Sequence, residues 1–279
     1  MRAVPRRLLA ALIDDAALFP PGNAPMTAAL KEHEHHRHAW YAGFIGPFVC
    51  PARRLDELLA ALPSDQHLDL ALVVDRPGDE AHAALRAAAA DDRISLVAVE
   101  AAHAVLGDDA GSVGATIRRL PSVVGFLEVD RDHLRVSLDL VGPAGWHAAK
   151  LRTGGATAAA FPTDAQVADF LVETADRGLQ FKLTAGLHHA VRRTDGSTGF
   201  EQHGLLNLLV ATADVLARED REQVVATLAE RAPEPLVDRV RSWSELDCLA
   251  IRGSFRSFGC CGVTEPIEEL VALGVVEEQ

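Results

Sequence analysis

Short apolar runs alternate with longer amphipathic stretches along the chain, and this alternation predicts the secondary structure. Apolar runs of strand length predict β-strands, and the Ala- and Leu-rich stretches of helical period between them predict crossover helices. Strands are expected at 8–13, 41–49, 68–75, 94–100, 123–130, 147–152, 179–184 and 254–260. Eight alternating βα units without a break in composition predict an α/β fold, a (β/α)8 TIM barrel that covers residues 1–279 as a single domain.

The segment between the seventh and eighth predicted strands is longer than the other connections. It contains one helical stretch at 205–219, a second at 220–232 and a third around 235–250. No low-complexity or linker-like stretch separates these helices from the rest of the chain. We therefore expect a helical elaboration of the barrel between strands seven and eight, and no second domain.

Composition and charge narrow the partners that the chain is expected to bind. A formal net charge of −13 and a pI of about 5.3 argue against nucleic acid and anionic membranes as partners. No stretch without charge reaches the length of a membrane span, and the first apolar run is too short for a signal segment. The four cysteines show no paired C-x-x-C spacing, which favours a reducing compartment. We expect a cytoplasmic protein without a cofactor that binds a small anionic substrate, and association as a homodimer stays open.

Polar residues that follow the strands are the candidates for a site, because the carboxyl ends of barrel strands carry the chemistry. Positive charge concentrates at strands six and seven of this acidic chain, opposite carboxylates from earlier strands. The candidate catalytic residues are Lys150, Lys182, Glu128 and Asp130, and the candidate substrate-binding residues are Asp15, Arg152, Gly154, Gly155, Gly186, His188 and His189.

The two lysines are the most specific feature of the sequence. The stretches AKLRTGG and FKLTAGLHH share the pattern Lys-Leu-x-Thr followed by glycine on two consecutive predicted strands. Equivalent positions on adjacent strands are close together, so repulsion and burial are expected to lower the pKa of Lys150 or Lys182. A lysine that is neutral near pH 7 is a nucleophile for carbonyl carbon, and Glu128, Asp130 or Asp75 would relay protons.

This lysine pair resembles the class I aldolases of the deoxyribose-phosphate aldolase type. The resemblance implies that Lys150 is the Schiff-base residue and that Lys182 lowers its pKa and relays protons. The chain differs from those aldolases in the His-His pair after the glycine of strand seven and in the long insertion that follows. The longer pattern LIDDAALFPPG, KLRTGG, FKLTAGLHH, HGLLNLL and SFG also resembles a bacterial family of TIM barrels that has no assigned reaction.

Glycines at the ends of strands six and seven are expected to form an anion-binding turn. Without Cβ atoms, Gly154, Gly155 and Gly186 let backbone N–H groups approach an anion, and Arg152 supplies positive charge. The expected function is therefore that of an aldolase-like lyase that acts on a small anionic carbonyl compound through a lysine Schiff base.

Two other functions stay open on the sequence alone. One is a lyase or isomerase dependent on a divalent metal, held by carboxylates with His188 or His189; the other is an anion-binding barrel without catalysis. His188 and His189 are adjacent and would point in opposite directions on an extended segment. The histidine-rich stretch at 32–38 is read as a solvated helix face and not a metal site. Cys260 and Cys261 are read as small residues packed at a tight turn.

Overall fold

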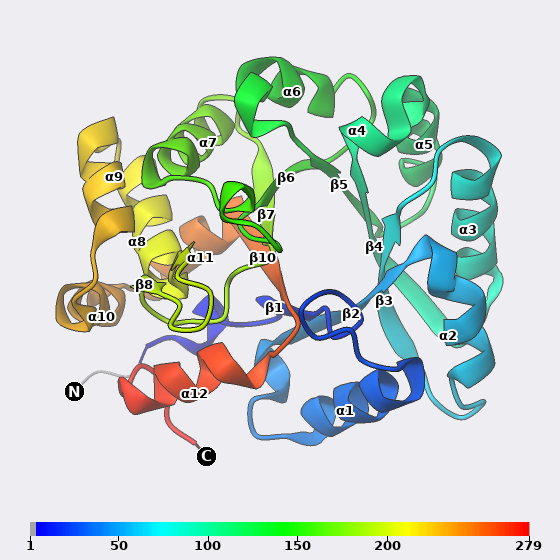
Figure 1. The fold of residues 1–279 in the computed structure, drawn as a ribbon, viewed down its shortest axis with the longest axis horizontal. Coiled ribbons are helices and arrows are strands. Elements are labelled where there is room, and N and C mark those ends of the chain that lie inside the picture. Colours follow the sequence, from blue (N-terminus) through cyan, green and yellow to red (C-terminus); the bar gives the residue numbers. More distant parts are fainter. Residues whose placement is uncertain (1–3, 279) are drawn as a thin grey trace.

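The structure, a computed structural model, describes residues 4–278 and contains a closed barrel of parallel strands (Figure 1). Each strand pairs with its neighbour in the chain, except that the last barrel strand returns to lie between the first and the seventh. This pairing confirms the predicted (β/α)8 barrel. The strands of the barrel are β1 (Ile13–Asp15), β2 (Ile45–Pro51), β3 (Leu68–Val74), β4 (Ile94–Ala102), β5 (Val124–Glu128), β6 (Ala148–Arg152), β7 (Gln180–Thr184) and β10 (Phe255–Cys260).

Helices form the outer layer of the barrel (Figure 1). They bury one apolar stripe against the strands, as expected for crossover helices. The helices of the first six units are α1 (Met26–His38), α2 (Leu55–Ala61), α3 (Gly78–Ala90), α4 (His103–Leu106), α5 (Ala110–Ile117), α6 (Leu134–Val141) and α7 (Asp164–Asp176). Helix α7 begins with a capping box in which Thr163 and Gln166 satisfy each other's backbone N–H groups.

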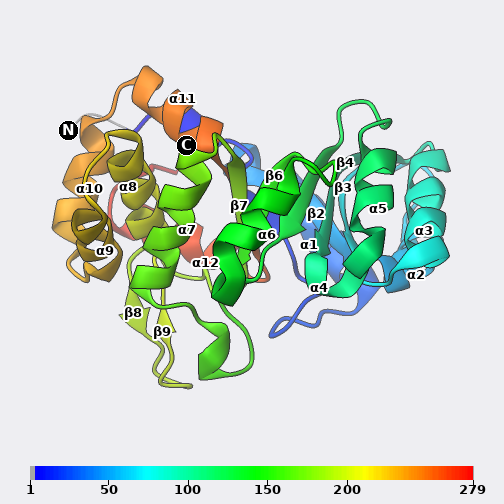
Figure 2. The same cartoon turned by 90° about the horizontal axis from the view of Figure 1, so that it is seen from above.

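The segment between β7 and β10 holds a short hairpin and four helices. These are β8 (Arg193–Thr194), β9 (Glu201–Gln202), α8 (Leu205–Leu216), α9 (Arg221–Ala229), α10 (Pro233–Ser242) and α11 (Glu245–Ser254); α12 (Thr264–Ala272) follows β10. Figure 2 shows that the β8–β9 hairpin and the loop between β6 and α7 project from the same end of the barrel, whereas α11 lies at the other end. The hairpin therefore extends the rim at the carboxyl ends of the strands.

The first strand differs from its prediction. The structure places β1 at Ile13–Asp15, so most of the predicted run at 8–13 precedes the strand. It begins at the end of the short 3-10 helix η1 (Arg6–Leu8) and continues through a turn at 9–11. Leu8, Leu9 and Leu12 are buried there. An apolar run of strand length can be buried in a turn as well as in a sheet, so its length alone misplaced the strand.

A separate apolar cluster lies inside the barrel. It consists of Ala16, Val49, Ala71, Ala98, Phe126 and Ala148. Four of these six residues are alanines, whose small side chains leave space for longer ones. The Nζ atom of Lys182 lies 5.6 Å from the centre of the Phe126 ring, a distance at which the ring face attracts the ammonium group.

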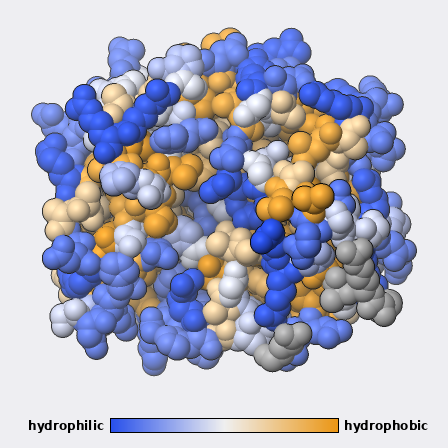
Figure 3. Space-filling model, turned by 180° about the vertical axis from the view of Figure 1, so that it is seen from behind, coloured by the Kyte–Doolittle hydropathy of each residue, from blue (hydrophilic) through white to orange (hydrophobic). Residues whose placement is uncertain are grey.

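Seen from behind, the molecule has hydrophilic residues around most of its edge, with apolar residues scattered between them (Figure 3). Scattered surface apolar residues are normal for a folded domain. Among the described residues, no helix is both long and apolar enough to cross a bilayer.

Candidate active site

A cavity of about 420 Å³ opens at the carboxyl ends of the barrel strands. Its walls are mostly apolar and include Phe19, Phe161 and Phe200, whereas charged groups form its floor and part of its rim. The predicted site residues that line it are Lys150, Arg152, Gly155, Lys182, Gly186 and His188. A cavity of this kind at the carboxyl end of a barrel is the usual place for a barrel active site.

The two lysines lie side by side on the floor of this cavity. Lys150 on β6 is the register partner of Lys182 on β7, and their exposed fractions are 3% and 1%. The chain contains three lysines in all, and the third, Lys31, is exposed on α1. The predicted juxtaposition of the two barrel lysines is therefore confirmed.

Carboxylates separate the ammonium groups and form alternating ion pairs with them. Glu100 on β4 accepts hydrogen bonds from both lysines, and its Oε2 atom lies 2.9 Å from the Nζ atom of Lys150. Lys150 is also 3.0 Å from Glu128, and Lys182 contacts Asp14 of β1. In order, this ion-pair chain consists of Asp14, Lys182, Glu100, Lys150, Glu128 and Arg152.

These carboxylates reverse the expected effect on the lysine pKa values. Burial alone would lower the pKa of Lys182, but Asp14 and Glu100 raise it above its usual value. Burial alone would likewise lower the pKa of Lys150, but Glu100 and Glu128 raise it. The prediction of a depressed lysine pKa is therefore wrong, because a carboxylate lies between the ammonium groups and outweighs their repulsion.

The acidic members of the ion-pair chain respond differently to burial. Burial would raise the pKa of Glu100, yet Lys182 and Lys150 together lower it to about 2. Burial also opposes ionisation of Glu128, but Lys150 and Arg152 lower its pKa. At Asp14 burial is the stronger effect, and it raises the pKa despite the contact with Lys182. Asp14 is therefore the carboxyl group of the ion-pair chain that takes up a proton most readily.

Asp14 is held in the barrel by tight packing. Its Oδ2 atom accepts a hydrogen bond of 2.8 Å from Ser257 on β10, while its buried Oδ1 atom makes no hydrogen bond. A Cβ atom at Gly46 of β2 would lie 2.1 Å from that Oδ1 atom. Glycine at position 46 therefore makes room for the Asp14 carboxylate.

Three predicted site residues lie away from both the cavity and the ion-pair chain. Asp15 points away from the barrel interior and pairs with His33 of α1 at 2.9 Å, with both side chains buried. The exposed Asp130 caps the 3-10 helix η5 (Arg131–His133). His189 pairs with Glu269 of α12 at 2.8 Å. None of them contacts the ion-pair chain in the structure, because each lies on the outer side of a strand or in the loop beyond it.

The glycines at the ends of β6 and β7 pack against each other. A Cβ atom at Gly154 would lie 2.6 Å from the Cα atom of Gly186, so Gly154 closes the turn beneath the cavity lining. Gly186 has a φ of +73°, which favours glycine. Gly155 and Gly186 reach the cavity, whereas Gly154 supports them.

Arg152 and His188 bring positive charge to the rim of the cavity. Arg152 donates to Glu128 at 3.2 Å and leaves about half of its side chain exposed. Contacts with the sulfur atoms of Cys260 and Cys261 raise the pKa of His188. The rim can therefore offer two cations to an anion.

Sequence reasoning did not select Glu100 or Asp14, the two carboxylates that hold the lysines. Period-two alternation along β4 and β1 would have placed both on the inner face of the barrel. Because β1 was expected to end at residue 13, both Asp14 and Asp15 were expected to follow it, and only Asp15 was selected. The strand boundary was the missing information.

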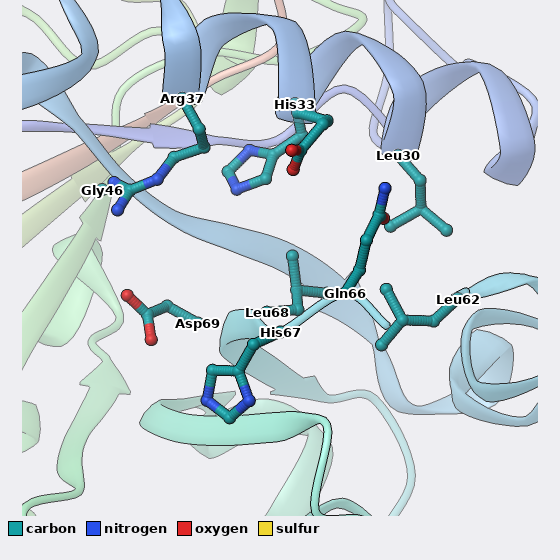
Figure 4. A pocket seen from close by; sticks show the side chains of 10 residues that line it. Leu30, His33, Arg37, Gly46, Leu62, Gln66, His67, Leu68 and Asp69 are labelled. Carbon is teal, nitrogen blue, oxygen red and sulfur yellow. The ribbon is translucent and has the colours of Figure 1, made fainter. Parts of the chain in front are cut away.

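A second, smaller cavity of about 170 Å³ lies beneath α1 (Figure 4). His33 and Arg37 of α1 face it from one side and His67 and Asp69 from the other. The histidine-rich helix is not wholly solvated as expected, since His33 and His36 are buried. In residues 4–278 no group of three or more His, Cys, Asp or Glu side chains is placed to hold a metal ion.

Comparison with known proteins supports no family assignment. No family model matches the chain, and no curated protein matches it. Among solved structures the chain is similar to UMP synthase of Leishmania donovani, with 14% identity and a TM-score of 0.45 over 85% of this chain and 55% of that chain. It is similar to OMP decarboxylase of the same organism, with 15% identity and a TM-score of 0.43 over 86% of this chain and 97% of that chain.

This chain thus spans about half the length of that UMP synthase. Likeness at this identity says nothing about the reaction, and the barrel assignment rests on the closed strand order. The resemblance to class I aldolases stays a prediction.

Proposed function

We propose that the protein is a lyase-type enzyme that acts on a small anionic carbonyl compound. The ion-pair chain on the floor of the cavity is the observation that carries this proposal. It places two buried ammonium groups and the carboxylates that can exchange protons with them beneath an apolar-walled space. Such preorganised charges act strongly where water is excluded.

Electrostatics favours a route in which the lysines react as ammonium groups. Both pKa values are raised, so Lys150 and Lys182 carry protons at pH 7. When a carbon–carbon bond next to a carbonyl breaks, its electron pair is delocalised to the carbonyl oxygen as an enolate. A buried ammonium stabilises that oxygen and then donates a proton to the carbon. Glu100 or Glu128 accepts the proton of the β-hydroxyl group, whose oxygen becomes the carbonyl oxygen of the released fragment.

The Schiff-base route expected from the sequence requires one further step. Lys150 would first pass a proton to Glu128, 3.0 Å away, and its nitrogen would then attack the carbonyl carbon with loss of water. The imine would accept the electron pair of the breaking bond. Lys150 is proposed as the nucleophile of the two, because Glu128 lies beside it as a proton acceptor.

The anionic group of the substrate is assigned to the rim. Arg152 and His188 supply positive charge there, and the backbone of Gly155 and Gly186 lines the same side of the cavity. The rim would hold the anion while the carbonyl group points down towards the lysines.

Borohydride trapping tests the two routes. The protein is incubated with glyoxylate, pyruvate or small aldehydes, reduced, and digested for mass spectrometry. The Schiff-base route predicts an adduct on Lys150 that is lost in Lys150→Arg, since a guanidinium is not nucleophilic, and that is retained in the matched control Lys31→Arg. The ammonium route predicts turnover without any adduct.

Screening of carbon–carbon bond cleavage with small keto acids and hydroxyketones supplies the complementary measurement. Anion binding without turnover of any compound would instead favour the non-catalytic barrel. Tight binding of a divalent metal would contradict the proposal and would favour the metal-dependent lyase or isomerase instead.

A further inference from the structure

The turn between β10 and α12 carries a cysteine that faces the cavity. Cys261 lines the cavity and is partly exposed. Its Sγ atom lies 3.7 Å from the Nε2 atom of His188, which lines the same cavity from the loop after β7. A thiol and an imidazole thus lie together at the rim, separate from the lysines on the floor.

A carboxylate orients the imidazole from its other side. Glu265 in the first turn of α12 approaches the Nδ1 atom of His188 to 2.6 Å. The absence of a side chain at Gly262 gives this carboxylate space, since a Cβ atom there would lie 2.8 Å from an oxygen of Glu265. The hydrogen bond fixes the ring so that Nε2 points at Cys261. A nucleophile, a base and an orienting acid in this order are the parts of a thiol catalytic triad.

Cys260 is less suited to the role of nucleophile. It is 2% exposed, and its Sγ atom donates to the carbonyl oxygen of Gly262 at 3.3 Å. Burial raises the pKa of its thiol. Cys261 faces the cavity one residue further on, near the positively polarised N-terminal end of α12.

We propose that Cys261, His188 and Glu265 form a thiol–imidazole–carboxylate triad, and that Cys261 adds reversibly to the carbonyl group of a small aldehyde bound in the cavity. This site is distinct from the ion-pair chain and shares only His188 with the anion-binding rim of the lyase proposed above, on whose reaction it does not depend. It gives the cavity a second reactive group, at its rim.

The proposed step is an addition without oxidation or reduction. The thiolate of Cys261 forms a carbon–sulfur bond to the carbonyl carbon while the carbon–oxygen π bond breaks. Its electron pair moves to oxygen, which takes the proton from the Nε2 atom of protonated His188. The product is a thiohemiacetal, and reversal of the same steps releases the aldehyde.

Alkylation of the intact protein with iodoacetamide tests the reactivity of the thiol. The groups that face Cys261 are His188, Cys260 and, through His188, Glu265. A protonated imidazole beside a thiol favours the reactive thiolate form. Because the Nε2 atom of His188 lies 3.7 Å from its Sγ atom, we expect Cys261 to react roughly five to ten times faster than a cysteine peptide at pH 6.5.

Variants connect this rate to the triad. His188→Gln should reduce the rate to that of the peptide. Glu265→Gln, at an exposed position, should reduce the rate less and leave the fold intact. In the matched control Cys260→Ser, the fast reaction should persist. A wild-type rate equal to that of the peptide and unchanged in both triad variants would overturn the assignment, and so would a label found on Cys260.

Protection from iodoacetamide tests the addition to an aldehyde. Glyoxylate should slow the alkylation of Cys261 in a saturable and reversible manner. Glycolate, which has the same size and charge without a carbonyl, should protect it far less. Equal protection by both compounds would show that the thiol does not add to the carbonyl. The same conclusion would follow if borohydride made the protection permanent and the adduct were found on a lysine.

Discussion

Replacement of Glu100 by glutamine tests whether the ion-pair chain holds the barrel interior together. Glu100 is 1% exposed and accepts hydrogen bonds from both barrel lysines. The substitution Glu100→Gln keeps the shape of the side chain but removes the charge that separates two buried ammonium groups. Breaking a buried ion pair in this way costs about 3–5 kcal/mol.

The pKa of Glu100 gives the same magnitude independently. A fall from the usual 4.5 to about 2 corresponds to about 3 kcal/mol of stability, since each pKa unit is worth about 1.4 kcal/mol. For a chain of 279 residues, an unfolding entropy of about 2.1 cal/mol/K per residue converts this to a Tm that is lower by about 5 °C.

The dependence of this difference on pH has a definite sign. A carboxyl group whose pKa is lower in the folded state contributes its full stability above the unfolded value of 4.5 and loses it as the pH falls towards about 2. The free energy of unfolding of wild type and Glu100→Gln should therefore differ by about 3 kcal/mol at pH 7 and by less below pH 4.5.

Urea denaturation at pH 7, 5 and 3.5 measures this difference. Glu219→Gln, on an exposed segment, is the matched control and should change stability by less than about 0.5 kcal/mol. A Glu100→Gln protein as stable as wild type at pH 7, or a difference that stays constant down to pH 3.5, would refute the reasoning.

Three further predictions concern the surroundings of the ion-pair chain. Because the pKa values of Lys150 and Lys182 are raised, their contribution to stability is present below pH 10.5 and lost above it. The midpoint of urea denaturation should therefore fall more steeply above pH 10.5 in wild type than in Lys150→Met. Parallel curves for the two proteins would contradict this. Gly46→Ala should cost about 3 kcal/mol or more in chemical denaturation, because its Cβ atom would lie 2.1 Å from Asp14; a loss below 0.5 kcal/mol would contradict the packing. Gly186→Ala should cost roughly 2–5 kcal/mol, because φ is +73° and the added Cβ atom would lie 2.8 Å from a backbone oxygen; an equally stable variant would contradict it.

The barrel could be predicted because its determinants are local in sequence. Seven of the eight strands contain enough consecutive apolar residues to be recognised from their pattern, and most predicted bounds lie within a few residues of the observed ones. β1 is the exception. It has three residues, and two of them, Asp14 and Asp15, are acidic. The pattern of apolar residues therefore does not reveal that Asp14 is buried inside the barrel and Asp15 against α1.

The lysine pair could also be predicted, because alternation and equivalent spacing place both side chains on one face of adjacent strands. The pKa values could not. Their sign depends on Glu100, which lies on β4 and reaches both lysines across the barrel. A contact of this kind depends on the register and closure of the whole barrel, and no local pattern encodes it.

Charge is balanced locally although the chain carries a net charge of −13. The ion-pair chain contains three carboxylates and three cationic groups, so its members compensate one another from the cavity floor up to Arg152 at the rim. An anionic ligand therefore gains little attraction from the floor as a whole. It must gain its affinity at the rim, where Arg152 leaves half of its side chain exposed and His188 is held in a charged form. Under the proposed function, recognition of the anion and reaction of the carbonyl group thus belong to different layers of the same cavity.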